Sequence, residues 1–237
     1  MENKAIPKVD WIIIAGCGHT GSTLLAKILS QHPEVFCNYQ ENGQFLLYNW
    51  FRLDVLLDEQ NQAAVHCGKR FVLEKTPRHV WHLDQIRRSL PTSKIILTVR
   101  EPKATITSLF KRTGDLKSSI QRYQDDTIQV IRQASQFTDV KIIKYEDLTA
   151  NASSVTKDIC NFLDIDWNSD LLEFHKDSRN WFDGQSDAHT SLRNFQLSQP
   201  LYSSEKTWID KSTKKIPKSL EDWYQELGVQ IAEALGY

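Results

Sequence analysis

Residues 11–25 read WIIIAGCGHTGSTLL, and this stretch decides the fold class. It begins with five apolar residues that include three isoleucines, a composition typical of a strand buried on both faces of a parallel sheet. Glycines follow at positions 16, 18 and 21, and residues 24–29 (LLAKIL) have the character of a helix. A strand, a glycine-rich turn and a helix in this order predict the start of an α/β fold.

The same alternation continues along the chain. Further strands are expected at residues 35–37, 71–75, 94–99 and 140–145, and further helices at 80–89, from Pro102 onward, at 118–137 and at 152–163. The pattern predicts a central, mostly parallel sheet with helices on both faces. We expect one domain over residues 1–237, with its core at about 10–165. Residues 166–237 are expected to form an irregular segment on the active face, followed by an amphipathic helix at 217–235 that packs on the sheet.

Composition excludes several classes of protein. Apolar residues make up 40% of 237 residues, which is typical of a globular chain and not of a disordered one. There are 29 basic and 30 acidic residues, so the formal net charge is −1. A chain with this balance lacks the excess of basic residues that is typical of a nucleic-acid binder or of a polybasic protein that binds membrane surfaces. A basic pocket for a small anion remains compatible with it.

The N-terminus and the cysteines indicate the compartment. Residues 1–10 are mostly polar, and the five apolar residues after them are too few for a signal peptide core or a membrane span. Four cysteines are widely and irregularly spaced, with no CxxC pair, so we expect reduced thiols rather than a disulfide framework or a zinc site. We therefore expect a cytoplasmic protein, and its oligomeric state is left open.

The glycine-rich turn has the features of a phosphate-binding loop. Successive backbone N–H groups at a helix N-terminus favour an anion, and the hydroxyls of Ser22 and Thr23 add donors. The spacing G-x-x-x-x-G-S-T is that of a P-loop, with Ser22 at the position of the usual lysine. That lysine and a strand-end aspartate serve the nucleotide and Mg²⁺ in an NTPase. Their absence argues against an NTPase.

A second anion signal follows the strand at 94–99. The strand ends in Arg100, and Ser108 lies eight residues later on the helix that begins at Pro102. A guanidinium and a hydroxyl at these places can converge on one phosphate.

These segments resemble the sulfotransferases that use 3′-phosphoadenosine 5′-phosphosulfate (PAPS). Residues 18–25 are similar to the family's 5′-phosphosulfate loop, and residues 99–102 with Ser108 to its 3′-phosphate motif. Residues 74–77 (EKTP) resemble a Lys-Thr-Pro segment of the carbohydrate and tyrosylprotein branches, and residues 145–148 (YEDL) a strand end whose tyrosine lies against adenine. In order along the chain, the four segments cover roughly residues 11–165.

The resemblance implies site residues and a cofactor. PAPS would be the sulfuryl donor and adenosine 3′,5′-bisphosphate (PAP) the product, with no metal required. The nucleotide-binding residues that it implies are Gly18, His19, Thr20, Gly21, Ser22, Thr23, Arg100, Ser108, Tyr145 and Arg193. Among these, Arg193 falls where relatives bring a late basic residue back to the 3′-phosphate.

It also implies a catalytic pair. Sulfuryl transfer needs groups that neutralise charge on the departing phosphate and a base that takes the proton of the acceptor hydroxyl. Glu41 lies where carbohydrate-acting relatives carry a glutamate base, with His66 and His79 as the alternative bases. Lys75 is expected to stabilise the sulfonate or the bridging oxygen.

One position departs from the family pattern. His19 stands where the family has Arg or Lys, and an imidazole is only partly charged near neutral pH. Either His19 supplies the cation and joins Glu41 and Lys75 in catalysis, or it braces the loop and Lys75 is the cation.

Other functions and the acceptor remain open at this point. A nucleotide-dependent small-molecule kinase with an atypical P-loop and a non-catalytic nucleotide-binding module are the alternatives. His79 and His82 are three apart, but no third ligand accompanies them, so no metal site is expected. The acceptor is expected to be a saccharide or another small molecule. Candidate flat walls for it are Trp50, Phe51, Trp81, Trp181, Phe182, Tyr202 and Trp208.

Overall fold

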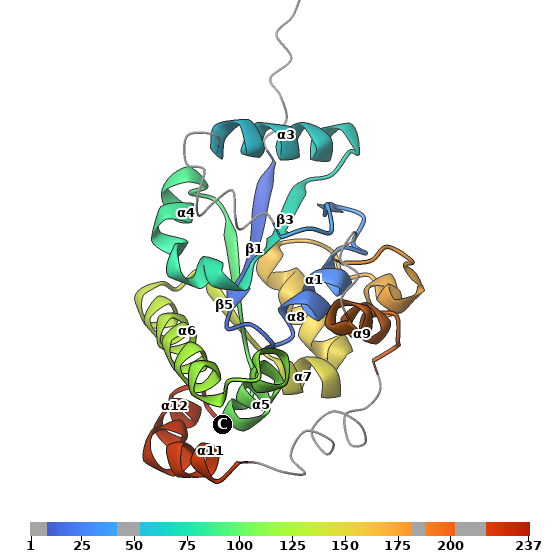
Figure 1. Ribbon diagram of the computed structural model, residues 1–237. Coiled ribbons are helices and arrows are strands. Elements are labelled where there is room, and N and C mark those ends of the chain that lie inside the picture. Colours follow the sequence, from blue (N-terminus) through green and yellow to red (C-terminus); the bar gives the residue numbers. More distant parts are fainter. Residues whose placement is uncertain (1–8, 42–52, 182–187, 202–216) are drawn as a thin grey trace, which may run out of the picture.

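The centre of the molecule is a parallel sheet with the strand order β2-β3-β1-β4-β5 (Figure 1). The computed structural model describes residues 9–41, 53–181, 188–201 and 217–237. In this part of the chain the strands are β1 (Asp10–Gly16), β2 (Val35–Phe36), β3 (Phe71–Lys75), β4 (Lys94–Val99) and β5 (Val140–Lys144). The prediction of an α/β fold with a parallel sheet is confirmed.

The position of β1 explains its unbroken apolar run. β1 pairs with β3 on one side and with β4 on the other, so it is the middle strand. Side chains of successive strand residues point to opposite faces. Ile12 and Ile14 enter one core cluster, whereas Trp11, Ile13 and Ala15 enter the other. Both faces are therefore covered, which accounts for the apolar residues at all five positions from 11 to 15.

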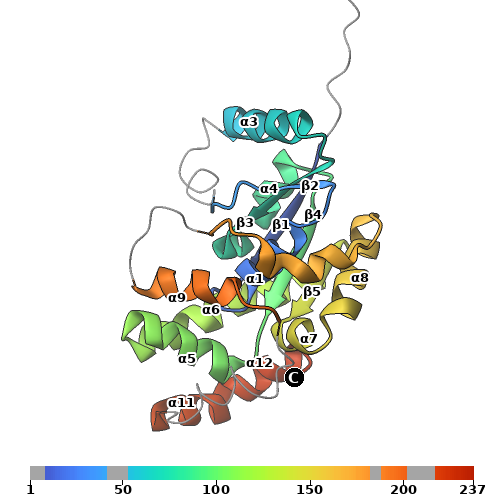
Figure 2. The ribbon, with the colours of Figure 1, turned by 90° about the vertical axis from the view of Figure 1, so that its right-hand side faces the viewer.

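Helices form a layer on each face of the sheet (Figures 1 and 2). Helices α1, α7, α8, α9 and η3 contribute to the cluster that contains Ile12, and η2, α4, α5, α6, α11 and α12 to the cluster that contains Ile13. The α-helices are α1 (Ser22–Leu29), α3 (Leu53–His66), α4 (Leu83–Ser89), α5 (Pro102–Thr113), α6 (Leu116–Gln136), α7 (Tyr145–Ala150), α8 (Ala152–Leu163), α9 (Ala188–Leu197), α11 (Lys218–Trp223) and α12 (Val229–Ala234). The 3₁₀ segments are η2 (Pro77–Trp81) and η3 (Ser169–Lys176), and η4 (Tyr224–Gly228) is a π turn.

Three regions differ from the pattern expected from the sequence. The sequence predicts no element at α3, because half of its residues are polar or charged. The helix expected at 80–89 is divided at His82, whose φ of −126° separates η2 from α4. The stretch expected to be irregular contains η3 and α9, and a π turn interrupts the C-terminal helix.

The chain carries its chemical groups to one edge of the sheet. In a parallel sheet the carboxyl ends of all strands lie at the same edge. The glycine-rich loop follows β1, Lys75 ends β3, Arg100 follows β4 and Tyr145 follows β5. Segments that are far apart in the sequence thereby become neighbours.

Two further findings concern the whole described chain. All four cysteines lie in the described residues and are free thiols. Within residues 9–41, 53–181, 188–201 and 217–237, no helix has the length and apolar character needed to span a bilayer.

Candidate functional site

The loop between β1 and α1 contains two residues with a left-handed backbone conformation. His19 has φ 70° and Gly21, the N-cap of α1, has φ 87°. The hydroxyl of Thr20 donates to the Cys17 carbonyl at 2.7 Å and lies 2.7 Å from the Thr98 hydroxyl. The side chain of Thr20 thus braces the loop against β4, and only its backbone N–H remains for a ligand. Ser22 and Thr23 begin α1 with their side chains buried against the loop.

Two glycines of this loop admit side chains from distant helices. A Cβ atom on Gly21 would lie 2.5 Å from Cδ2 of Tyr145, and one on Gly18 would lie 2.8 Å from Nη2 of Arg122. Neither distance is tolerated between real atoms, so any larger residue would displace these neighbours. The absence of a side chain at positions 18 and 21 is what brings Tyr145 and Arg122 against the loop.

The two predicted anion sites touch each other. Nδ1 of His19 lies 2.8 Å from Oγ of Ser108, and Nη1 of Arg100 lies 3.4 Å from the carbonyl oxygen of His19. The Arg100 guanidinium also sits 4.4 Å from the ring centroid of Tyr145. Burial raises the pKa of Tyr145, which keeps the phenol neutral. The loop, Arg100, Ser108 and Tyr145 therefore form one continuous surface.

The start of α5 is fixed independently of any ligand. The Glu101 carboxylate accepts hydrogen bonds from the backbone N–H groups of Lys103 and Ala104 and caps the helix. The Glu101 N–H donates to Glu146 at 3.0 Å, and the other oxygen of Glu146 accepts from the Tyr237 hydroxyl at 2.7 Å. These carboxylates hold α5, and with it Ser108, in place.

The two predicted catalytic residues form an ion pair. Nζ of Lys75 donates to Oε1 of Glu41, although the residues are 34 positions apart. The Lys75 side chain has no exposed surface, whereas that of Glu41 is 34% exposed. Lys75 also lies 5.0 Å above the ring of the buried Trp181. Burial lowers the pKa of Lys75, contact with Glu41 opposes this, and the positive charge of Arg193 adds to the lowering.

Arg193 reaches the loop from α9. Its Nη2 donates to Oγ1 of Thr23 at 3.0 Å, and its charge acts on Lys75. The sequence suggests a contact of Arg193 with the 3′-phosphate. The structure places the guanidinium at the beginning of α1, where its charge also acts on Lys75.

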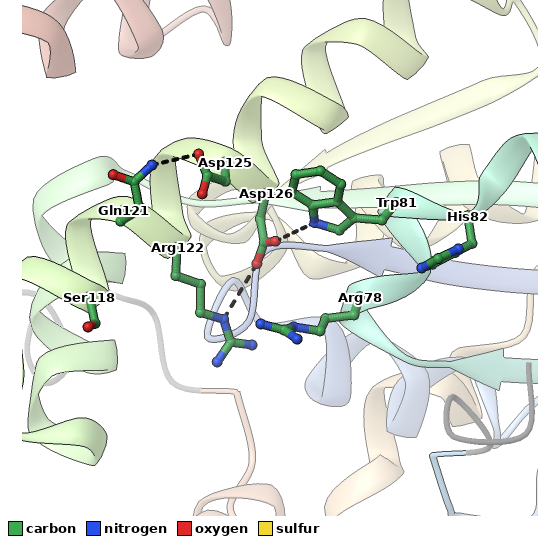
Figure 3. Close-up of a pocket in the computed structure, with 8 residues that line it drawn as sticks. All are labelled: Arg78, Trp81, His82, Ser118, Gln121, Arg122, Asp125 and Asp126. Atoms are coloured by element: carbon green, nitrogen blue, oxygen red, sulfur yellow. Dashed lines mark hydrogen bonds and ion pairs between the residues drawn. The ribbon is translucent and has the colours of Figure 1, made fainter. Parts of the chain in front are cut away.

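A pocket of about 600 Å³ opens between η2 and α6 (Figure 3). Nε1 of Trp81 donates to Oδ1 of Asp126 at 2.7 Å, and Nε of Arg122 lies 3.5 Å from Oδ2 of the same carboxylate. Because Arg122 also touches Gly18, the pocket adjoins the glycine-rich loop. The residues that line it are Arg78, Trp81, His82, Ser118, Gln121, Arg122, Asp125 and Asp126.

The histidines proposed as alternative bases are poorly placed. Burial lowers the pKa of His79 to about 3, so it is neutral and its 4.0 Å approach to Glu74 is not an ion pair. Its side chain is also fully buried. His66 is exposed at the end of α3, just before β3 begins, which places it at the opposite edge of the sheet. In the described part of the chain, no group of three or more metal-ligating side chains is found.

The aromatic residues proposed as acceptor walls differ in exposure, and most of them lie outside the described residues. Trp81 is 47% exposed in the pocket, whereas Trp181 is fully buried under Lys75. The remaining candidates lie outside the described residues: Trp50, Phe51, Phe182, Tyr202 and Trp208.

Comparison with known proteins decides the family. The model of the sulfotransferase family matches residues 44–169, more than half of the chain. The chain belongs to the sulfotransferase family. A Caenorhabditis briggsae protein provisionally named a protein-tyrosine sulfotransferase is 25% identical over 197 residues, and the match covers 70% of this sulfotransferase and 69% of that protein.

Solved structures share the fold. The sulfotransferase domain of the Synechococcus PCC 7002 olefin synthase superposes with a TM-score of 0.65 at 19% identity, over 100% of this chain and 97% of that one. A mouse sulfotransferase complexed with PAP gives a TM-score of 0.59 at 16% identity, over 98% and 91% of the two chains. The resemblance stated from the sequence motifs is thereby confirmed at the level of family and fold.

The family match and the site overlap only in part. Residues 44–169 include Lys75, Arg100, Ser108 and Tyr145, but they exclude the loop at 16–23. The structure joins that loop to the matched part through β1. The side chain of Arg122 also lies against the loop, and no sequence motif points to it, because it stands in mid-helix.

Proposed function

We propose that this sulfotransferase moves the sulfuryl group from PAPS to a hydroxyl of an acceptor and releases PAP. The observation that carries the proposal is the pairing of Lys75 with Glu41 beside a phosphate-type loop. Lys75 is in register with Ile14 on the neighbouring strand, so its ammonium group stands next to the loop that follows β1. A cation, a carboxylate and an anion-binding loop at one place are the groups that sulfuryl transfer requires.

The nucleotide would bind across the loop and α5. The backbone N–H groups of residues 18–23, together with the hydroxyls of Ser22 and Thr23, would hold the 5′-phosphosulfate. Arg100 and Ser108 would hold the 3′-phosphate, and Tyr145 would face the adenine. The contact between His19 and Ser108 supports this arrangement, because it puts both phosphates within reach of one connected surface.

Different side chains would have different roles in the sulfuryl transfer. The acceptor oxygen forms a bond to sulfur while the bond between sulfur and the phosphate oxygen breaks, and PAP leaves with the electron pair. Glu41 would take the proton of the acceptor hydroxyl. Lys75, His19 and the loop donors would stabilise the charge that grows on the sulfonate and the leaving phosphate.

The contact of Arg193 with Thr23 favours a role for Arg193 at the loop, in the region of Lys75. We propose that Arg193 adds charge at the 5′ end of the nucleotide rather than at the 3′-phosphate. Its effect on the pKa of Lys75 indicates that both cations act on the same region.

The acceptor would present a hydroxyl to Glu41. A saccharide or another small molecule is the class that we favour from the sequence. A tyrosine phenol is the second candidate, because the Caenorhabditis briggsae relative carries the name of a protein-tyrosine sulfotransferase. The cytoplasmic location and the single-domain organisation stay predictions.

Replacement of Glu41 tests the proposal directly. Glu41→Gln should bind PAP like the wild type and lose roughly a hundredfold to ten-thousandfold in turnover, because an amide cannot take the proton. Calorimetry with PAP and turnover of labelled PAPS over a panel of saccharides, phenols and tyrosine peptides are the measurements. Glu59→Gln, an exposed glutamate of α3, is the control. A wild type that binds neither PAP nor PAPS would refute the proposed function.

A further inference from the structure

The loop of this sulfotransferase lacks a permanently charged side chain of its own. Its basic position is His19, and the imidazole is engaged with Ser108. Lys75 is directed to Glu41, and Arg193 is directed to Thr23. A loop that binds a phosphosulfate gains most from a guanidinium, which stays charged at every accessible pH and presents several donors.

Arg122 brings such a group to the loop from α6. Its Nη2 lies 2.8 Å from the point where a Cβ on Gly18 would stand, so the guanidinium rests against the loop backbone next to His19. The side chain is 29% exposed and lines the pocket between η2 and α6. The guanidinium is therefore in contact with the loop and still accessible to a ligand.

Asp126 fixes the orientation of Arg122. The carboxylate is buried, accepts a hydrogen bond from Trp81 at 2.7 Å and lies 3.5 Å from Nε of Arg122. Because Nε faces Asp126, the two terminal nitrogens of the guanidinium are turned toward the loop and the pocket (Figure 3). A side chain that is held in this way needs little reordering when a ligand arrives.

The other charges of the pocket leave room for an anion. Asp126 is already paired with Arg122 and Trp81, and Asp125 accepts from Gln121 at 2.8 Å. Arg78, on the opposite wall, is exposed, and its guanidinium has no hydrogen bond or ion pair among the residues that the structure describes. Figure 3 shows its guanidinium pointing toward that of Arg122. Two guanidinium groups that converge in this way favour a bound anion.

We propose that Arg122 is a catalytic residue that binds the sulfuryl group of PAPS and supplies the charge that the loop lacks at position 19. The inference rests on the proposed function and deepens it. In the transfer the bond between sulfur and the 5′-phosphate oxygen breaks, the bond between sulfur and the acceptor oxygen forms, and the proton passes to Glu41. Arg122 keeps its proton throughout and stabilises the sulfonate oxygens by charge-assisted hydrogen bonds.

Comparison of PAPS with PAP isolates this contact, because the two nucleotides differ only in the sulfuryl group. Arg122→Gln should weaken PAPS binding at least tenfold while PAP binding changes less than twofold, and Arg122→Lys should give an intermediate loss. Competition binding in the absence of any acceptor measures both affinities. Arg132→Gln is the matched control, because Arg132 lies on α6 like Arg122 and is likewise ion-paired, in its case with Asp84 of α4.

The outcomes separate the inference from the proposed function. Melting temperatures are measured alongside, and Arg122→Lys, which keeps a positive charge near Asp126, replaces Arg122→Gln should the latter fail to fold. Equal losses for PAPS and PAP, or no loss for either, would overturn the role of Arg122. So would an unchanged PAPS affinity combined with a raised acceptor KM, which would place Arg122 on the acceptor. Absence of nucleotide binding by the wild type would refute the proposed function itself.

Discussion

His19 connects the two halves of the nucleotide site. Its φ of 70° is uncommon for a residue with a side chain, although His, Asn and Asp are enriched there. This backbone conformation accompanies the 2.8 Å contact between its imidazole and Ser108. One residue therefore belongs to the 5′ loop by its backbone and to the 3′ motif by its side chain.

Charge at position 19 can be separated from loop geometry by substitution. His19→Arg should keep or raise turnover and flatten its decline on the alkaline side, because a guanidinium stays charged where an imidazole loses its proton. His19→Asn should keep the left-handed backbone and lose turnover more than PAP affinity, since charge on the leaving oxygen grows mainly in the transition state. Turnover against pH for the three proteins is the measurement. An asparagine variant with wild-type turnover at all pH values would remove His19 from the mechanism.

Arg100 should decide the preference for a 3′-phosphate. Arg100→Ala should weaken PAP binding by about 1.5–3 kcal/mol, the range for a hydrogen bond to a charged group, and leave binding of adenosine 5′-monophosphate nearly unchanged. Calorimetry with both nucleotides checks this. Arg112→Ala, at an exposed position of α5, should change neither affinity. Equal wild-type affinities for the two nucleotides would contradict the assignment of the 3′ site.

At the scale of elements, the loop and its neighbouring helices form one unit. Gly18 admits Arg122 of α6, and Gly21 admits Tyr145 of α7. The loop is thus shaped by packing from both layers of helices as well as by its own sequence. Its anion-binding geometry depends on the correct docking of elements that are more than a hundred residues away.

Two left-handed glycines distinguish backbone strain from lost packing. Gly114→Ala, at φ 71° with open space around the position, should lower stability by roughly 1 kcal/mol through the backbone alone. Gly21→Ala carries the same strain and also places a methyl group 2.5 Å from the Tyr145 ring, so it should cost more stability and abolish PAP binding. Thermal melts and PAP calorimetry on both variants are the test. Equal losses of stability in the two variants, with PAP binding retained in both, would show that the Tyr145 ring moves aside without cost.

The sequence predicts those elements whose signals are local. The bounds of β3 and β4 agree with the strands expected at 71–75 and 94–99, because each is a short apolar run ended by Pro or Arg-Glu-Pro. The structure brings Glu41 and Lys75 into contact, and their catalytic roles stay predictions from the family resemblance. The position of Arg122 depends on how α6 packs beside the loop, and the contact of Arg193 depends on where α9 docks. Spacing within the sequence contains neither piece of information.

At the scale of the whole molecule, a polar cluster ties the C-terminal third to α1. The Tyr39 hydroxyl donates to Asp177 at 2.7 Å, and the buried Lys27 donates to the carbonyls of Asp177 and Arg179 at 3.0 and 2.8 Å. Burial tends to raise the pKa of Asp177, but hydrogen bonds from Arg179, Tyr39 and Gln31 outweigh it and hold the pKa well below its usual range. The cluster therefore contributes stability only while Asp177 is ionised.

Acid titration should reveal this contribution. A carboxyl whose pKa is lower in the folded state stabilises fully above its unfolded pKa of about 3.9 and progressively less as pH falls through the folded value. Asp177→Asn should lower the free energy of unfolding by about 1.5–3 kcal/mol at pH 7, and the difference from the wild type should shrink below pH 4. Denaturant unfolding between pH 2 and 7 measures it. Asp170→Asn, an exposed carboxyl of η3, should show no such convergence; a constant difference for Asp177→Asn would refute the argument.

The central place of β1 has a consequence for synthesis on the ribosome. Asp10 and its neighbours are made before their ladder partners, which begin at Phe71 on one side and Lys94 on the other. Until those strands emerge, the nascent chain carries five consecutive apolar residues with open backbone donors and acceptors on both edges. Such a segment is prone to pair with other chains. Expression at low temperature or with a chaperone that binds nascent apolar segments should therefore raise the yield of folded protein more than it would for a fold whose first strand pairs early.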